Sequence, residues 1–139
     1  MQRPPKASSR GSKMSKLVLI VEDDPAARNL LDIFLRRQGF RTETACDGVD
    51  ALGRAMAHPP DLVMLDLSMP RLDGLRLLRA LRDIDTLRGV PVIVTTSRSD
   101  GEAVAEATQL GVEQYLVKTR YTLKDLSAIV RRHLPRLAG

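Results

Sequence analysis

The chain alternates between two patterns of apolar and polar residues. Short runs rich in apolar and β-branched residues predict strands, and each is followed by a longer stretch with apolar residues at three- and four-residue spacing, which predicts a helix. The predicted strands are Leu17–Val21, Arg41–Ala45, Asp61–Asp66, Pro91–Thr95 and Glu113–Val117. The predicted helices run from Pro25 to a stop at Gly39, over Gly48–Ala57, from Asp73 through Leu81, from about Asp100 to Leu110 and from about Thr122 to Leu134.

This alternation predicts an α/β fold. Strands that are separated by helices and short loops form a parallel sheet with right-handed crossovers. The run Asp61–Asp66 is apolar throughout its middle, as expected for a central strand that is covered on both faces. We therefore predict a five-stranded, doubly wound parallel sheet flanked by five helices.

The positive charge is concentrated at the start of the chain. The net charge is +5, but residues 1–14 contain four basic residues and no acidic one, so the remainder is close to neutral. These charges are spaced and lack interleaved aromatics, and contacts to nucleic acid would be weak and salt-sensitive. We predict a disordered basic leader at 1–15 and one domain at 16–136, with no output module and no direct DNA binding.

No targeting or membrane signal is evident. The N-terminus lacks an apolar segment of the signal type, and no stretch reaches the apolar length of a membrane span. The one cysteine, Cys46, cannot form an internal disulfide, which fits a reducing compartment. We expect a cytoplasmic protein that does not associate with membranes.

Carboxylates stand at the ends of two predicted strands. Glu22 and Asp23 directly follow the first strand, and Asp66 ends the third. Because the carboxyl ends of parallel strands meet at one edge of a sheet, these acids converge if the two strands are neighbours. Crowded carboxylates repel each other and favour a bound cation, and hard oxygen ligands favour Mg²⁺.

Two further strand ends carry polar groups that complement this cluster. The fourth strand ends at Thr95 and Thr96, and the fifth ends at Lys118. A carboxylate that accepts a phosphoryl group needs a metal to screen the phosphate, together with a cation and a hydroxyl for its other oxygens. Lys118 can supply the cation and Thr96 the hydroxyl, whereas Thr95 points to the opposite face of its strand.

From Lys16 to about Leu134 the chain resembles the receiver domain of two-component response regulators, in particular stand-alone receivers of the chemotaxis type. Four motifs carry the resemblance, in order and at family-like spacing: LVLIVEDDP, LVMLDLSMPRLDG, PVIVTTS and QYLVK. The resemblance implies a (βα)5 flavodoxin-like fold and a magnesium ion as cofactor.

The resemblance also implies roles for the acidic residues and their neighbours. Asp66 matches the phosphorylated aspartate and Asp23 the principal metal-binding acid. Glu22 matches the neighbouring acid, which acts on the metal through water, and Ser68 falls where the backbone carbonyl is a metal ligand. Pro70 and Gly74 match residues of the loop that follows the phosphorylated aspartate in the family.

The remaining matches concern the switch. Thr96 matches the hydroxyl that moves toward the phosphoryl group, and Lys118 the lysine that pairs with that group. Tyr115 matches the aromatic residue whose ring changes exposure when the hydroxyl moves. Thr119 stands where family members usually have a proline, so a cis bond is not expected there. Arg98, two residues after Thr96, is either a solvated loop residue or a modulator of the lifetime of the phosphorylated state.

These matches predict a phosphorylation-dependent signalling switch and not an enzyme. The expected partners are a sensor histidine kinase or a histidine phosphotransfer protein, and a downstream target protein bound in trans by the face of the fourth helix, fifth strand and fifth helix. Phosphorylation-dependent homodimerisation is also compatible with the pattern. The alternatives are a phosphorelay shuttle or phosphate sink, and a magnesium-dependent aspartyl-phosphate hydrolase, which Ser68 disfavours because hydrolases commonly carry an acid at that position.

Overall fold

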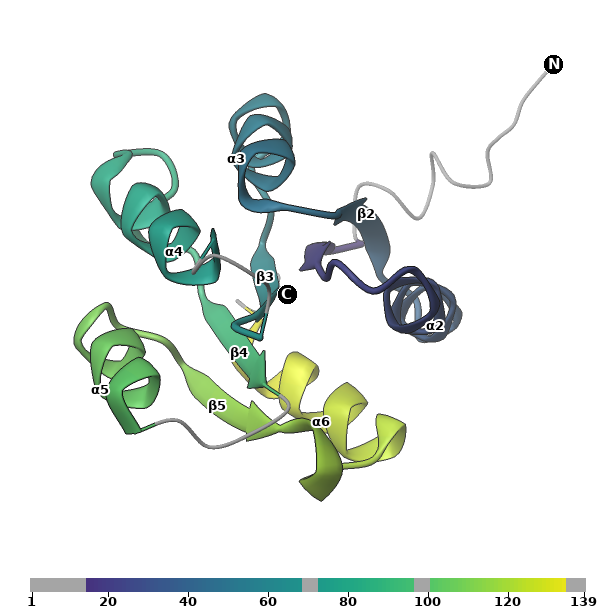
Figure 1. The fold of residues 1–139 in the computed structure, drawn as a ribbon. Helices are drawn as coiled ribbons and strands as arrows, with labels where there is room; N and C mark the ends of the chain where they lie inside the picture. Colours follow the sequence, from purple (N-terminus) through teal and green to yellow (C-terminus); the bar gives the residue numbers. More distant parts are fainter. Residues whose placement is uncertain (1–14, 69–72, 97–100, 135–139) are drawn as a thin grey trace, which may run out of the picture.

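The computed structural model describes residues 15–68, 73–96 and 101–134. These residues form one sheet of five parallel strands with α-helices on both of its faces (Figure 1). The strands are β1 (Leu17–Val21), β2 (Arg41–Ala45), β3 (Leu62–Asp66), β4 (Val92–Thr96) and β5 (Gln114–Val117). Their order in the sheet is β2-β1-β3-β4-β5, which confirms the predicted doubly wound α/β fold.

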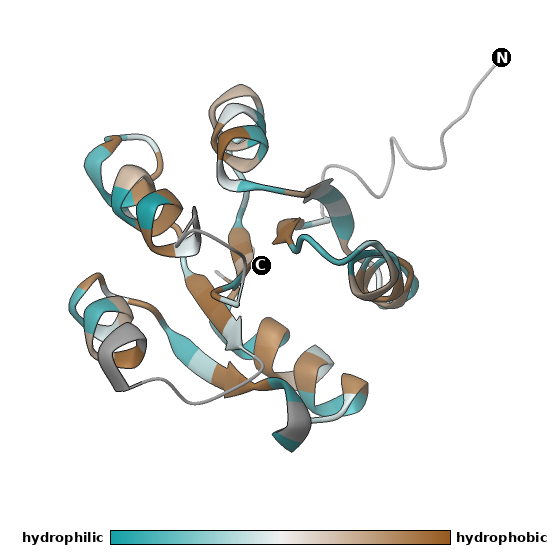
Figure 2. Cartoon of the chain, in the orientation of Figure 1, coloured by the Kyte–Doolittle hydropathy of each residue, from teal (hydrophilic) through white to brown (hydrophobic). Residues whose placement is uncertain are grey.

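Helices cover the sheet in two layers. They are α2 (Pro25–Arg37), α3 (Gly48–Ala57), α4 (Asp73–Asp83), α5 (Gly101–Gln109) and α6 (Leu123–His133). Helices α2 and α6 lie on one face of the sheet, and α3, α4 and α5 lie on the other (Figure 1). Figure 2 shows apolar residues along β3 and most of β4, and a mixture of apolar and polar residues on the helices.

The core is divided between the two faces by the two-residue period of the strands. On β1, Val18 and Ile20 pack toward α2 and α6, whereas Leu19 and Val21 pack toward α3 and α4. All five residues of β3 are buried, as expected for a strand that is covered on both faces. Strand β2, at the edge, has polar residues at its first four positions and is more exposed, which fits its charged residues Arg41 and Glu43.

The helix termini follow the sequence signals. The carboxylate of Asp24 accepts a hydrogen bond from the backbone N–H of Ala27 at 2.9 Å, and Pro25 occupies the first turn of α2. After α2 and α5 the chain turns at Gly39 and Gly111, whose φ angles are +100° and +77°. The predicted elements are therefore confirmed, with differences of one or two residues at their ends.

One short element lies outside the prediction. Lys118–Arg120 form a 3₁₀ helix, η2, directly after β5. The described residues contain no cis peptide bond, in agreement with the expectation for Thr119. The predicted leader lies outside the described residues except for Ser15. In the part of the chain that the structure describes, no helix is long and apolar enough to span a bilayer.

Candidate functional site

The candidate site lies where successive crossover connections change direction across the sheet. From β1 the chain first moves to β2 on one side, and then crosses to β3 on the other side of β1. Val21 pairs with Leu65 in the register of β1 and β3, so the residues that follow β1 lie beside Asp66. Such a switch point, at the carboxyl ends of the strands, is the usual place for a binding site in an open α/β sheet.

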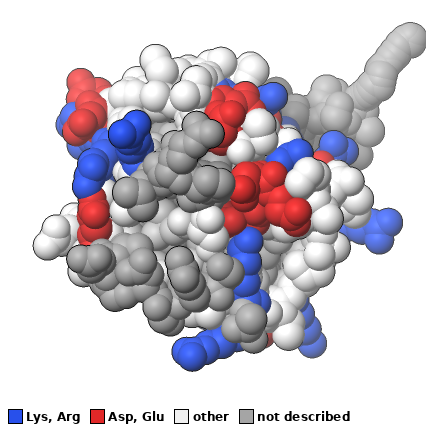
Figure 3. Space-filling model, viewed as in Figure 1, with Lys and Arg blue, Asp and Glu red and all other residues white. Residues whose placement is uncertain are grey.

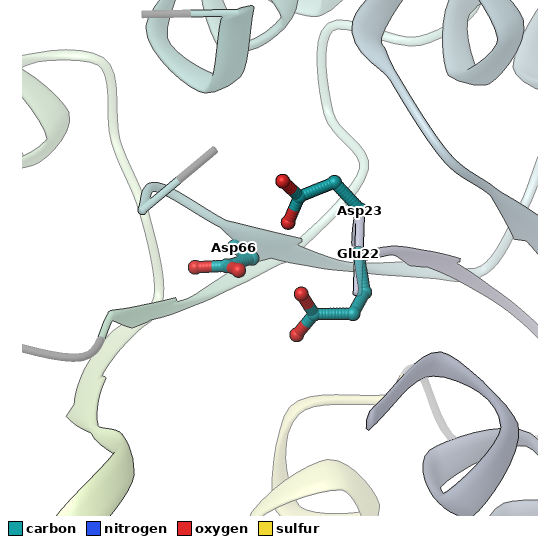
Figure 4. Close-up of side chains that lie close together, drawn as sticks. All are labelled: Glu22, Asp23 and Asp66. Carbon is teal, nitrogen blue, oxygen red and sulfur yellow. The ribbon is translucent and has the colours of Figure 1, made fainter. Parts of the chain in front are cut away.

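Three carboxylates converge at this point. Oxygen atoms of Glu22, Asp23 and Asp66 all lie within 4.8 Å of one another. The carboxyl groups of Glu22 and Asp23 lie on the side of their backbone that faces Asp66 (Figure 4). Glu22 and Asp66 are each 2 % exposed, whereas Asp23 is open to solvent. Acidic side chains gather near the middle of this face of the molecule (Figure 3).

Lys118 supplies a positive charge to two of these acids. Its Nζ lies 2.8 Å from Glu22 Oε1 and 3.1 Å from Asp66 Oδ2. Burial of Lys118 favours its neutral form, but the two carboxylates outweigh this effect and raise the pKa of Lys118. The ammonium group is therefore held in its charged form between the two buried acids.

Glu22 is the acid most affected by its surroundings. Burial and the hydrogen bond with Asp66 raise its pKa to about 7, although the hydrogen bond from Lys118 acts in the opposite direction. Without a bound metal ion, the positive charge of Lys118 thus does not offset the burial and crowding of the acids. A divalent ion at this position would favour the ionised carboxylates, and an all-oxygen donor set suits Mg²⁺. The residues present therefore fit the magnesium ion that the sequence predicts.

The loop after β3 holds the second oxygen of Asp66. The backbone N–H of Ser68 donates to Asp66 Oδ1 at 2.8 Å. The hydroxyl groups of Ser68 and Thr96 lie 3.1 Å apart and form a hydrogen bond. Thr96 is therefore connected to the loop of Asp66 through the Ser68 side chain, and Thr95, its neighbour, is buried in the strand.

Gly74 allows α4 to approach this loop closely. A Cβ atom at this position would lie 2.8 Å from Leu67 Cδ2 and 3.3 Å from the carbonyl oxygen of Asp66. A side chain here would require the Leu67 side chain to move and the backbone of the loop to shift by a few tenths of an ångström, which favours the glycine that follows the acid in the LDG segment.

Tyr115 lies apart from the carboxylates. It pairs with Val94 in the register of β4 and β5, and its ring packs against the core on the side of α5. Its hydroxyl is buried and has no hydrogen-bond partner among the described residues. The structure thus brings Glu22, Asp23, Asp66 and Lys118 together, connects Thr96 to them through Ser68, and places Tyr115 on the neighbouring strand.

Two residues near the site were not identified from the sequence. Arg28 in α2 donates from Nη1 to the carbonyl oxygens of Glu22, at 2.9 Å, and Asp23, at 3.4 Å. Tyr121, after η2, is half-buried against the core on the side of α2 and α6, and burial raises the pKa of its hydroxyl. A sequence signal existed for Arg28, because helical side chains lean toward the N-terminus of their helix, where the acids lie.

Three predictions from the sequence concern residues that lie wholly or partly outside the described part of the chain. Pro70 and Arg98 lie outside the described residues, as does the side chain of Thr119. The expectation that Arg98 modulates the phosphorylated state therefore stays a prediction.

Comparison with known proteins gives consistent results. Residues 18–131 match the family model of the response regulator receiver domain. The chain is 40 % identical over 118 residues to the Regulator of RpoS of Escherichia coli K12, covering 84 % of this chain and 33 % of that protein. It is 37 % identical over 123 residues to the DNA-binding response regulator MtrA of Mycolicibacterium smegmatis, covering 88 % of this chain and 52 % of that protein. The chain thus spans a third to about half of these relatives.

Solved structures show the same arrangement. The chemotaxis protein CheY4 of Vibrio cholerae superposes with a TM-score of 0.80 at 28 % identity, covering 86 % of this chain and 99 % of CheY4. The receiver domain of the sensor histidine kinase PA1611 of Pseudomonas aeruginosa, with a magnesium ion in its active site cleft, gives a TM-score of 0.77 at 28 % identity, with coverages of 86 % and 97 %.

Proposed function

The chain belongs to the family of response regulator receiver domains, and from this premise we propose that Asp66 is the residue on which it is phosphorylated. The observation that carries the proposal is the position of Asp66: it is buried, it adjoins two other acids, and it contacts Lys118. No packing role accounts for three converging carboxylates at the carboxyl ends of two central strands. We place the receiver domain at residues 16–136, in a protein of the cytoplasm.

The proposed reaction transfers a phosphoryl group from a phosphohistidine. A carboxylate oxygen of Asp66 attacks phosphorus, the bond between phosphorus and the imidazole nitrogen breaks, and the leaving imidazole keeps the electron pair of that bond. A bound magnesium ion would screen the charge of the phosphoryl oxygens. Asp23, Asp66 and the backbone carbonyl of Ser68 would hold it, and Glu22 would act on it through water.

Lys118 and Thr96 would bind the phosphoryl group. The lysine already lies 3.1 Å from Asp66 Oδ2, so its positive charge is in place before the transfer. A phosphoryl group on Asp66 would offer new acceptors to this ammonium group and to the hydroxyl of Thr96. Thr96 would have to exchange its hydrogen bond with Ser68 for one with the phosphoryl group.

The movement of Thr96 would provide the signal. It would shift an existing equilibrium between two arrangements of the end of β4 and of the Tyr115 ring. The surface formed by α5, β5 and α6 would then bind a target protein in trans. The phosphoryl donor would be a sensor histidine kinase or a histidine phosphotransfer protein.

The proposal is tested by phosphorylation with acetyl phosphate and Mg²⁺, followed by mass spectrometry of the intact protein and its peptides. The wild-type protein should gain one phosphoryl group on the peptide with Asp66, and Asp66→Asn should gain none. Asp83→Asn, which alters an exposed aspartate at the end of α4, serves as the matched control and should be labelled like the wild type. Undiminished labelling of Asp66→Asn would contradict the proposal.

A further inference from the structure

Arg28 binds the backbone of the two residues that bring Glu22 and Asp23 to the site. Its Nη1 lies 2.9 Å from the carbonyl oxygen of Glu22 and 3.4 Å from that of Asp23. Among the described residues Arg28 forms no ion pair with a carboxylate, although acids surround it in sequence. Its guanidinium is thus used to hold peptide groups.

The other hydrogen bonds of this loop do not involve Asp23. The backbone N–H of Glu22 donates to the carbonyl of Ala45 at 3.1 Å, and the N–H of Asp24 donates to Glu22 Oε2 at 3.2 Å. Asp24 itself is the cap of α2. Within the described part of the chain, the only hydrogen bond at Asp23 is the one that its carbonyl accepts from Arg28.

Electrostatic repulsion acts on the same residue. The carboxylate of Asp23 lies within 4.8 Å of those of Glu22 and Asp66, and it is the only exposed one of the three. Lys118 offsets part of the charge of the other two, and the repulsion that is left favours conformations in which Asp23 turns into solvent. A restraint on its peptide group limits this movement, because the backbone sets the direction of the Cα–Cβ bond.

We propose that Arg28 is a positioning residue for the metal site, which keeps the Asp23 carboxylate directed at Asp66 by holding the peptide groups of Glu22 and Asp23. The inference rests on the proposed function, because it assumes that magnesium is the ligand of this acid cluster. Arg28 acts before the ion binds, through the shape of the loop. It therefore affects the affinity for magnesium and leaves the transfer step almost unchanged once the ion is bound.

The test measures magnesium binding directly, by titrating MgCl₂ into the unphosphorylated protein at constant ionic strength and following backbone amide shifts by NMR. In Arg28→Gln the dissociation constant should rise roughly tenfold, as is typical when a residue that orients a metal ligand is removed. Arg28→Lys should lie between this variant and the wild type, because an ammonium group keeps the charge but cannot reproduce the planar guanidinium geometry. At saturating magnesium, labelling by acetyl phosphate should stay within about twofold of the wild type.

Two variants control for charge and for stability. Arg36→Gln removes a positive charge from the same helix, where Arg36 pairs with Asp32. Arg82→Gln removes a guanidinium that also binds carbonyl groups, those of Leu110, Arg88, Val90 and Gly111, at the other end of β4. Both should bind magnesium like the wild type.

The outcomes separate the two proposals. Unchanged magnesium affinity in Arg28→Gln, or an equal loss in Arg36→Gln, would overturn the role of Arg28 while leaving the function intact. A tenfold loss confined to the Arg28 variants would support it. A wild-type protein that binds no magnesium would contradict the proposed function itself, and the role of Arg28 with it.

Discussion

Lys118 has the most constrained charged side chain of the site. It is 30 % exposed and contacts two carboxylates that are almost fully buried. Buried carboxylates that lose their cation are costly, because neither water nor another charge replaces it. The lysine therefore contributes to folding as well as to the proposed binding of the phosphoryl group.

Replacement of Lys118 by methionine should lower the free energy of unfolding by about 3 kcal/mol in the absence of metal, at the lower end of the range for broken buried ion pairs because the lysine is partly exposed. Chemical denaturation at neutral pH measures this change. Lys124→Met, the same replacement at an exposed position of α6, should change stability by less than about 0.5 kcal/mol. Equal effects of the two variants would show that the contacts of Lys118 do not stabilise the fold.

Ser68 restrains the proposed switch residue. Its hydroxyl bonds that of Thr96, and this bond must break when Thr96 turns to a phosphoryl group. Ser68→Ala removes one hydrogen bond worth about 1 kcal/mol, so the protein should bind beryllofluoride, with magnesium present, up to roughly fivefold more tightly. Isothermal titration calorimetry measures the affinity. Weaker binding by Ser68→Ala would indicate that the hydroxyl supports the activated arrangement instead.

The sequence predicted the carboxylates and Lys118 better than it predicted the residues that support them. Asp66 and Glu22 stand at strand ends, where the periodic pattern breaks, so their convergence follows from topology alone. The position of Arg28 in the first turns of α2 indicates which way its side chain leans, but its partners are carbonyl groups, which every residue carries, so the sequence does not specify them. The bond between Ser68 and Thr96 depends on rotamers, which no pattern specifies.

At the scale of elements, α6 begins with a complete capping box. Thr122 accepts a hydrogen bond from the N–H of Asp125 at 3.1 Å, and the Asp125 carboxylate accepts one from the N–H of Thr122 at 3.0 Å. These bonds lower the pKa of Asp125 below its ordinary value of 3.8. The helix start is thus defined immediately after η2, where the chain has no proline to shape the loop.

The capping box predicts a pH-dependent effect. A carboxyl group with a lowered pKa in the folded state adds stability above its unfolded pKa, and this stability is lost as the pH falls through the folded value. Asp125→Asn should therefore be less stable than the wild type at pH 7, and the difference should shrink below about pH 4. Thermal unfolding at several pH values tests this. A difference that is independent of pH would show that the charge of Asp125 has no part in the cap.

The elements themselves were predictable because their ends carry strong signals. Asp24 and Pro25 start α2, and Gly39 and Gly111 end helices with positive φ angles. The 3₁₀ helix Lys118–Arg120 was missed, because a single turn shows no hydrophobic period.

At the scale of the whole molecule, magnesium and folding should be linked. Glu22 and Asp23 lie more than forty residues from Asp66 in the chain, so the site exists only in the folded protein. Magnesium at 100 times its dissociation constant should therefore raise the free energy of unfolding by about 2.7 kcal/mol. Denaturation with and without MgCl₂ measures this, and Asp23→Asn should lose most of the gain. An equal gain in Asp23→Asn would place the ion elsewhere.

A phosphoryl group on Asp66 should be read by Thr96 and transmitted to Tyr115. The most direct measurement is an NMR titration of the wild-type protein and of Asp66→Asn with beryllofluoride, a phosphoryl mimic, in the presence of magnesium. In the wild type the signals of the Thr96 methyl group and the Tyr115 ring should shift together to a second state, and in Asp66→Asn they should not move. A wild-type protein whose Thr96 and Tyr115 signals stay unchanged at saturation, or an Asp66→Asn variant that shifts equally, would contradict the account.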